Sequence, residues 1–214
     1  MTPREREIAR LLERNLSNNE SALSAGQEGG MTSECARDLC RLIAYHEAGH
    51  AVVARKLGLR IVDIEMTPSD GRVASVQTRS ALWVAKQAGG DQAALARGLY
   101  ADLMVVLAGE AAETLAGYPE NPECEGDFDN SINCAWHLAR IEAGLPIEPS
   151  PHEPQKLHPG DPLHTAGLTI IERAKAETKV MLKDNWQTVM RVAGLLATHD
   201  RLSQAELDHV IFHG

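Results

Sequence analysis

One stretch of this 214-residue chain decides how its fold is interpreted: Ala44-Tyr45-His46-Glu47-Ala48-Gly49-His50-Ala51-Val52-Val53. It contains His-Glu-x-x-His, and residues four apart lie one above the other on the same face of a helix. His46 and His50 can therefore present two imidazoles to one metal ion, with Glu47 directly beside the first. Zn²⁺ takes neutral imidazole nitrogens and keeps one position open in catalytic sites, where a neighbouring carboxylate can act as general base. The motif thus predicts a zinc site on a helix.

The residues around the motif have the periodicity of a helix. Apolar residues and the two histidines recur at spacings of three and four, at Leu39, Leu42, Ile43, His46, His50, Val53 and Leu57. Thr32 or Ser33 can cap the N-terminus of this helix, and Gly58 can follow its C-terminus. We therefore expect a helix that begins near residue 33 and ends near Leu57.

The composition is that of an ordinary globular protein, with 43% hydrophobic and 24% charged residues. A formal net charge of -9 argues against nucleic acid as a partner. No apolar run reaches about eighteen residues and the N-terminus has no apolar segment, so we expect no membrane span, no secretory signal and a cytoplasmic protein. The cysteines form no Cys-x-x-Cys pair, so a thiolate zinc site is not expected.

Two parts of unequal size are expected along the chain. Residues 1–32 predict an amphipathic helix followed by a flexible linker rich in Ser, Asn and Gly. Residues 33–214 predict the main domain. Its core must come from aliphatic residues and alanine, because the chain has only two Phe, three Tyr and three Trp, and this favours helices. Within it the proline-rich segment 144–163, with His152 and His158, is expected to be a loop.

Two short stretches, 60–66 and 73–77, alternate in polarity as strands do, and a turn at Pro68-Ser69-Asp70-Gly71 separates them. They predict a small sheet beside the motif helix. Longer apolar patterns predict helices over residues 91–115, over 127–143, and from 164 to the end, where Ser203-Gln204-Ala205-Glu206 is a capping box. The predicted fold class is therefore α+β and mostly helical.

A zinc site with two histidines needs a third protein ligand. The metzincin form is excluded, because Val53 and Lys56 stand where that form requires Gly and His. The thermolysin-like form places a Glu on a second helix, but the region after this motif has a strand and turn pattern. The candidates that remain lie on the later predicted helices: Glu110, Glu113, Asp127 and Asp129. Asp127 has a slight advantage, because the helix dipole favours a carboxylate in a first turn.

Three segments together carry a family resemblance. They are Tyr45–Val53, then Leu107-Ala108-Gly109-Glu110-Ala111-Ala112-Glu113, then Gly126-Asp127-Phe128 followed by Ser131 and Ala135. The first looks like the active-site core of the FtsH-type zinc peptidases. The second resembles that family's Leu-Gly-Gly-Arg-x-Ala-Glu stretch, and the third its Asn-Asp-Leu-x-x-Ala-x-x-x-Ala helix. With a similar C-terminal helical region, the resemblance covers roughly residues 35–210.

This resemblance implies a zincin-like domain of the FtsH peptidase type that hydrolyses peptide bonds of short or unfolded polypeptides. It implies one Zn²⁺ per chain, held by His46, His50 and Asp127, with Glu47 as the general base. We expect Glu113 to support a ligand imidazole through a hydrogen bond. Glu110 is the alternative metal ligand.

The sequence also departs from the family. It has neither a Gly-x-x-x-x-Gly-Lys-[Ser/Thr] phosphate loop nor a transmembrane helix, so we expect cleavage without ATP in this chain and consider a separate ATPase a candidate partner. The family's ring assembly permits a homo-oligomer without requiring one. The alternative function is a degenerate peptidase fold that binds a partner and keeps zinc as a structural or vestigial site. Glu47 argues against this alternative, because a structural site has no use for a base.

Overall fold

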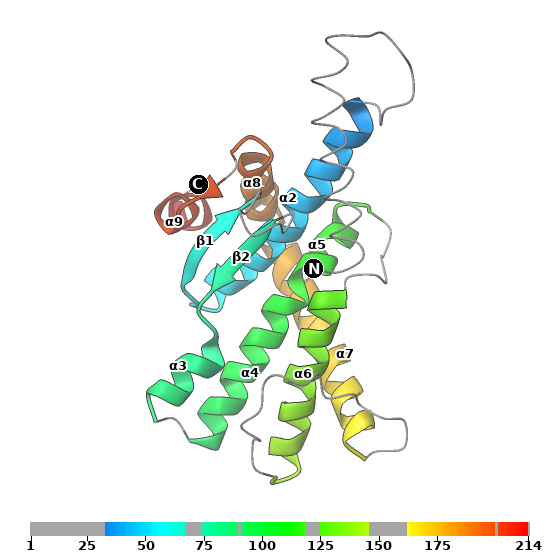
Figure 1. Cartoon of the computed structure of the whole chain (residues 1–214), viewed down its shortest axis with the longest axis vertical. Helices are drawn as coiled ribbons and strands as arrows, with labels where there is room; N and C mark the ends of the chain where they lie inside the picture. The colour runs from blue at the N-terminus through cyan, green and yellow to red at the C-terminus, as the bar shows by residue number, and fades with distance from the viewer. Residues whose placement is uncertain are drawn as a thin grey trace.

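The structure, a computed structural model, describes residues 33–66, 74–89, 91–118, 125–145, 162–199 and 201–213. These residues form a mostly helical α+β fold with one small antiparallel sheet (Figure 1). In chain order its elements are α2 (Ser33–Lys56), β1 (Ile61–Glu65), β2 (Ser75–Thr78), α3 (Ala81–Gln87), α4 (Gln92–Val106), α5 (Ala108–Leu115), α6 (Glu125–Glu142), α7 (Pro162–Asp184), α8 (Trp186–Leu196), β3 (Arg201–Leu202) and α9 (Gln204–His213). The helix and linker predicted for residues 1–32, and the loop histidines His152 and His158, lie outside the described residues.

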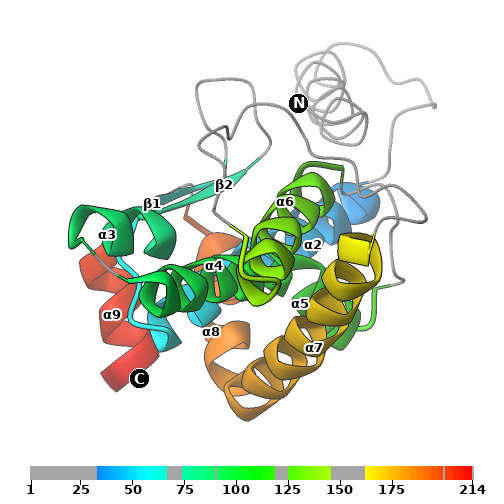
Figure 2. The same cartoon turned by 90° about the horizontal axis from the view of Figure 1, so that it is seen from below.

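The motif helix α2 has the bounds that its periodicity predicted, and it packs against α5 and α8. Gly49 permits a close approach to α5, because a Cβ at this position would lie 2.4 Å from the carbonyl oxygen of Ala108. Helices α4, α6 and α7 pack on one another in the other half of the molecule (Figures 1 and 2). The His-Glu-x-x-His segment of α2 is therefore packed closely against α5, the helix that follows α4.

The sheet has the strand order β2-β1-β3 and lies against α2. Ile64 of β1 pairs with Val76 on one side and with Leu202 on the other. An irregular register between Ile61 and Asp63 lets both isoleucines of β1 turn toward the core, where each is fully buried. The predicted small sheet beside the motif helix is confirmed. The third strand was not predicted, because two residues are too few to carry an alternating pattern.

The core is aliphatic, as the composition predicted. Its largest fully buried hydrophobic side chains come from α2, β1, α4, α7, α8 and α9: Val52, Val53, Ile61, Ile64, Leu103, Leu182, Val189, Val192 and Leu207. Alanines fill the close contacts between α2, α4, α5 and α6, where Ala48, Ala108, Ala112 and Ala135 are fully buried. Among the described residues, no helix is both long and apolar enough to cross a membrane.

The helix predicted over residues 91–115 is two helices. α4 ends at Val106 and α5 begins at Ala108. Leu107 lies between them and is both the C-cap of α4 and the N-cap of α5. Helical periodicity continues through this point, so the sequence pattern did not reveal the break. The Val105 carbonyl accepts a backbone N–H at this cap, and its second lone pair remains available to a side chain.

Two other helices differ from expectation. The short helix α3 was not predicted, and its N-terminus is capped from a distant helix: Asp102 of α4 accepts hydrogen bonds from Ser80 Oγ at 2.6 Å and from the Ala81 N–H at 2.7 Å. Ser80 also caps α3 locally, because its Oγ accepts from the Trp83 N–H at 3.2 Å, but a helix of seven residues is too short to show a clear periodic pattern. α7 begins at Pro162, inside the predicted loop 144–163. Proline is well suited to a first helical turn, because it has no N–H to leave unpaired there.

Candidate metal centre

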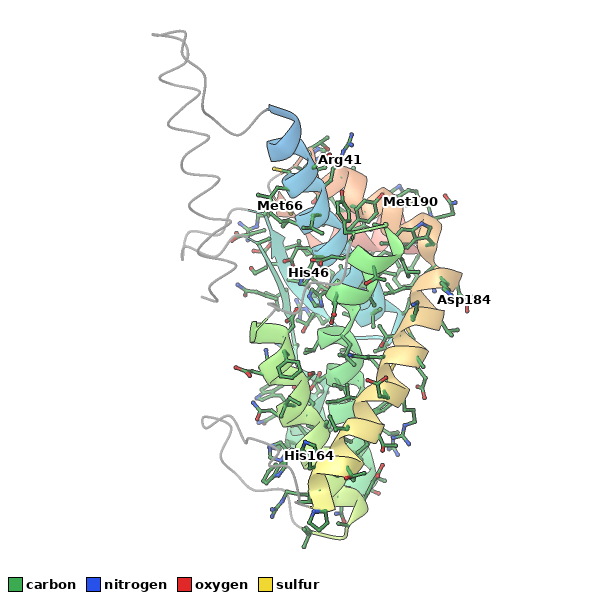
Figure 3. The ribbon with its side chains drawn as sticks, turned by 90° about the vertical axis from the view of Figure 1, so that its right-hand side faces the viewer. Arg41, His46, Met66, His164, Asp184 and Met190 are labelled. Carbon is green, nitrogen blue, oxygen red and sulfur yellow. The ribbon has the colours of Figure 1, made fainter. Side chains whose placement is uncertain are left out.

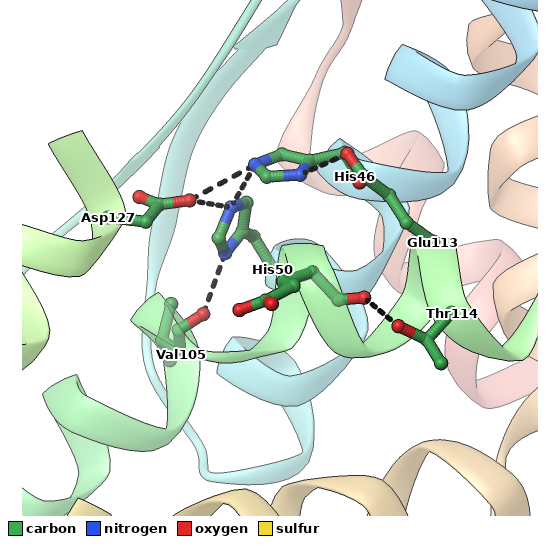
Figure 4. Close-up of polar contacts among 7 residues, drawn as sticks. His46, His50, Val105, Glu113, Thr114 and Asp127 are labelled. Carbon is green, nitrogen blue, oxygen red and sulfur yellow. Dashed lines mark hydrogen bonds and ion pairs between the residues drawn. The ribbon is translucent and has the colours of Figure 1, made fainter. Parts of the chain in front are cut away.

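Four elements contribute to one polar cluster in the interior of the helical part. α2 supplies His46 and His50, the end of α4 supplies the Val105 carbonyl, α5 supplies Glu113, and α6 supplies Asp127 (Figure 4). Figure 3 shows His46 inside the molecule, whereas Arg41 lies nearer the outer end of the same helix. The cluster therefore joins helices that are far apart in the sequence.

Three atoms with lone pairs converge at the centre of this cluster. The Nε2 atoms of His46 and His50 lie 2.9 Å apart, and Asp127 Oδ2 lies 3.1 Å from the first and 3.3 Å from the second. Ligand atoms bound tetrahedrally to Zn²⁺ at its usual bond lengths lie about 3.3 Å from one another. The triangle of His46, His50 and Asp127 thus has nearly the dimensions of one face of a zinc tetrahedron.

The outward nitrogen of each imidazole has its own acceptor. His50 Nδ1 donates to the Val105 carbonyl at 2.6 Å, and His46 Nδ1 donates to Glu113 Oε1 at 2.8 Å. Because a carbonyl and a carboxylate only accept, these bonds place the ring proton on Nδ1 and leave the Nε2 lone pair facing inward in the neutral ring. This is the arrangement in which histidines bind metals, with the second nitrogen oriented by an outer partner.

Gly109, the second residue of α5, leaves the space that such an ion needs. A Cβ at this position would lie 2.5 Å from His46 Nε2 and 2.6 Å from His50 Nε2. Any side chain at 109 would therefore collide with both imidazoles and push at least one of them out of place. The break at Leu107 and this glycine together bring the backbone of α5 up to the cluster without filling its centre.

Glu47 is buried on α2 beside these histidines. Burial alone would lower the pKa of His46, but hydrogen bonds to Asp127 and Glu113 and the negative charge of Glu47 outweigh it and hold that pKa well above 6.5. Burial would raise the pKa of Asp127, but the charge of His50 and hydrogen bonds from both histidines hold it well below its ordinary value. The site therefore stabilises a concentrated positive charge, whether proton or metal ion.

These observations form a test of whether the cluster suits a metal ion. Three ligand atoms of the types that Zn²⁺ prefers converge, two of them are oriented by outer hydrogen bonds, and the centre between them is kept clear by a glycine. The donor set and the space both fit a zinc ion with an open fourth position. His46, His50 and Asp127 would hold it.

Of the four carboxylates that the sequence left open as third ligand, the structure brings Asp127 to the two histidines. Glu113 bonds the outer nitrogen of His46, in the position expected of it. Asp129 is exposed on α6, and Glu110 is only partly buried on α5; within the described residues neither belongs to the metal-ligand group. Val105 was missed altogether. The one nearby signal in the sequence was Gly109, a glycine inside a stretch that has the pattern of one continuous helix.

No protein-family model matches this chain, and a search of curated proteins finds no significantly similar relative. The site is supported by its geometry and by the resemblance of the three sequence segments.

Proposed function

We propose that this chain is a zinc-dependent metallopeptidase of the FtsH type, with a zincin-like fold. The observation that carries the proposal is the convergence of His46 Nε2, His50 Nε2 and Asp127 Oδ2 around the space left by Gly109. Glu47 supports a catalytic role for the site over a purely structural one. It stands between the two ligand histidines in the sequence, and three protein ligands already suffice without it.

In this proposal Zn²⁺ supplies a Lewis acid for the scissile carbonyl and makes water more acidic near neutral pH. His46, His50 and Asp127 would hold the ion in place. The Val105 carbonyl and Glu113 keep the two rings from turning, so the ligand atoms stay in position before any substrate arrives.

Glu47 would move the proton in the reaction. Its carboxylate accepts a proton from the water molecule as the water oxygen bonds to the peptide carbonyl carbon. It then gives that proton to the amide nitrogen as the C–N bond breaks, so that an acid and an amine leave and Glu47 is regenerated. A buried carboxylate is effective here, because few solvent molecules compete for the proton.

The substrates proposed are short or unfolded polypeptides, presented with or without the help of a separate ATPase. The ligand side chains are largely covered, with 16% of His46, 11% of His50 and 32% of Asp127 exposed. Atoms covered to this degree favour a carbonyl in an extended segment over one held in the surface of a folded protein. An extended chain can reach them.

The test is the isosteric change Glu47→Gln, with unfolded casein as substrate and zinc measured by elemental analysis. The variant should keep one zinc per chain while kcat/KM falls by about 10²–10⁴-fold, the usual contribution of a general base. Asp129→Asn is the matched control, because it removes an exposed carboxylate of α6 and should leave zinc and activity unchanged.

The alternative, a degenerate peptidase fold that binds a partner around a structural zinc, gives a different result. The wild-type protein would then hold zinc and cleave no peptide in a broad unfolded library, and Glu47→Gln would behave identically. A zinc-free preparation as active as the loaded one would contradict both functions.

A further inference from the structure

The last helix, α9, carries a second pair of histidines with metal-ligand spacing. His209 and His213 are four residues apart, and their ring centroids lie 6.0 Å apart. Leu207 and Ile211 anchor the inner face of α9 in the core. Each histidine follows one of these anchors by two positions, about 200° around the helix, so both project to solvent. Figure 1 places α9 at the outer edge of the molecule, beside β1.

The pair resembles the candidate metal centre in one respect and differs in another. His46 and His50 have the same spacing, and their ring centroids are 4.6 Å apart. The rings of His209 and His213 are further apart but exposed, and exposed side chains change rotamer in nanoseconds or less. A modest rotation of either ring would let both bind one ion, at little cost in packing.

Two positive charges beside α9 lie on its side that faces α2. Phe212 turns toward α2, where Arg55 and Lys56 lie 5.4 and 5.6 Å from the centre of its ring. Arg55 is also paired with Asp208 at 2.6 Å. The charge of Arg55 is thus balanced by Asp208 on α9 itself.

We propose that His209 and His213 form a second metal site, which binds one divalent late-transition-metal ion such as Cu²⁺, Ni²⁺ or Zn²⁺ by two imidazoles and water. Imidazole pairs favour these metals, with Cu²⁺ bound most tightly among first-row divalent ions. Because only the helical form of α9 presents both rings together, the bound ion also stabilises this helix. The site is independent of the proposed peptidase chemistry.

In the first experiment the full chain is titrated with Ni²⁺, and binding is followed by calorimetry. In the second, trace Cu²⁺ is added and the paramagnetic broadening of histidine ring resonances is followed by NMR. Wild-type protein loaded with one equivalent of zinc should bind one further Ni²⁺, and the signals of His209 and His213 should broaden together. His209→Ala and His213→Ala should each weaken this binding roughly tenfold to a hundredfold, because the second ring no longer acts at high effective concentration.

His199→Ala is the matched control, because it removes an exposed histidine that precedes β3 and should leave this binding unchanged. The proposal is overturned if His209→Ala and His213→Ala bind the further Ni²⁺ as tightly as wild type. Broadening that is no stronger for His209 and His213 than for His199 overturns it as well. Neither readout depends on peptide cleavage, so the outcome is separable from that of the Glu47 test.

Discussion

His50 donates a hydrogen bond of 2.6 Å from Nδ1 to the carbonyl oxygen of Val105, which lies in the last turn of α4. This carbonyl also accepts a backbone N–H at the cap where α4 ends, and its second lone pair is left for the imidazole. A break in a helix thus determines which nitrogen of His50 faces the centre of the site. The candidate metal centre depends on this interruption as much as on the motif itself.

The space beside the two imidazoles can be closed by one methyl group. In Gly109→Ala the new Cβ would lie 2.4–2.6 Å from atoms of both rings, so at least one ring must turn away. We expect the variant to fold but to bind no zinc, as measured by elemental analysis after purification with excess zinc.

Gly194→Ala is the control for helix propensity. A Cβ at position 194 of α8 would meet no atom within 4 Å, so this variant should keep its zinc and gain up to about 1 kcal/mol in free energy of unfolding. A Gly109→Ala protein with full zinc content would show that the ion binds elsewhere.

The assignment of the third ligand can be tested by removing single carboxylates. Asp127→Asn should weaken zinc binding by more than the about 100-fold that is typical of losing an outer partner, because a charged ligand atom is lost. Glu110→Gln and Asp129→Asn remove carboxylates outside the metal-ligand group and should leave the dissociation constant within about twofold. The measurement is competition with a zinc chelator. Zinc lost in Glu110→Gln but retained in Asp127→Asn would reverse the assignment.

Glu113 is 3% exposed and accepts from His46 at 2.8 Å. Glu113→Gln keeps the shape and an acceptor oxygen but removes the negative charge that makes the ring a better ligand. We expect zinc affinity to fall about 10–100-fold with the fold intact, since outer partners typically contribute this much. Unchanged affinity, measured against the same chelator, would mean that this hydrogen bond only orients the ring.

Zinc binding should depend on pH in a direction set by His46. Burial would lower its pKa, but Asp127, Glu113 and Glu47 hold that pKa well above 6.5, so the metal-free site keeps its proton to higher pH than an ordinary histidine. Zinc must displace that proton, and its affinity should rise about tenfold per pH unit until the pH passes the raised pKa. Calorimetry in buffers of different ionisation enthalpy would detect the released proton.

The raised pKa of His46 also predicts how the stability of the metal-free protein changes with pH. Because folding raises the pKa of His46, its charged ring stabilises the folded protein. This stabilisation is fully present below pH 6.5 and is lost as the pH rises through the pKa of the folded state. The Tm of the metal-free form should therefore fall on the alkaline side, and zinc should restore it there. In Glu113→Gln the decline should begin at lower pH. A Tm independent of pH over this range would contradict the charge assignment.

Most of the elements were predictable because their signals are local. The bounds of α2 follow from apolar residues spaced by three and four. The strands β1 and β2 follow from alternation on either side of the predicted turn 68–71, which itself lies outside the described residues. The break at Leu107 left no such signal, because the residues on both sides remain apolar and helix-forming. The short helix α3 was missed because its seven residues carry little periodicity, and part of its support comes from Asp102 on another helix.

The sequence by itself determined that His46 and His50 share one helical face, because the rise and turn of a helix place residues four apart over one another. It could not determine which acid joins them. Asp127 lies 81 positions along the chain from His46, and four candidate carboxylates had equally plausible spacings. Only the packing of α5 and α6 against α2 decided that Asp127 would reach the imidazoles, that Glu113 would bond one from outside, and that Gly109 would leave room between them. Contacts between distant segments depend on how whole helices pack, and no local pattern encodes that.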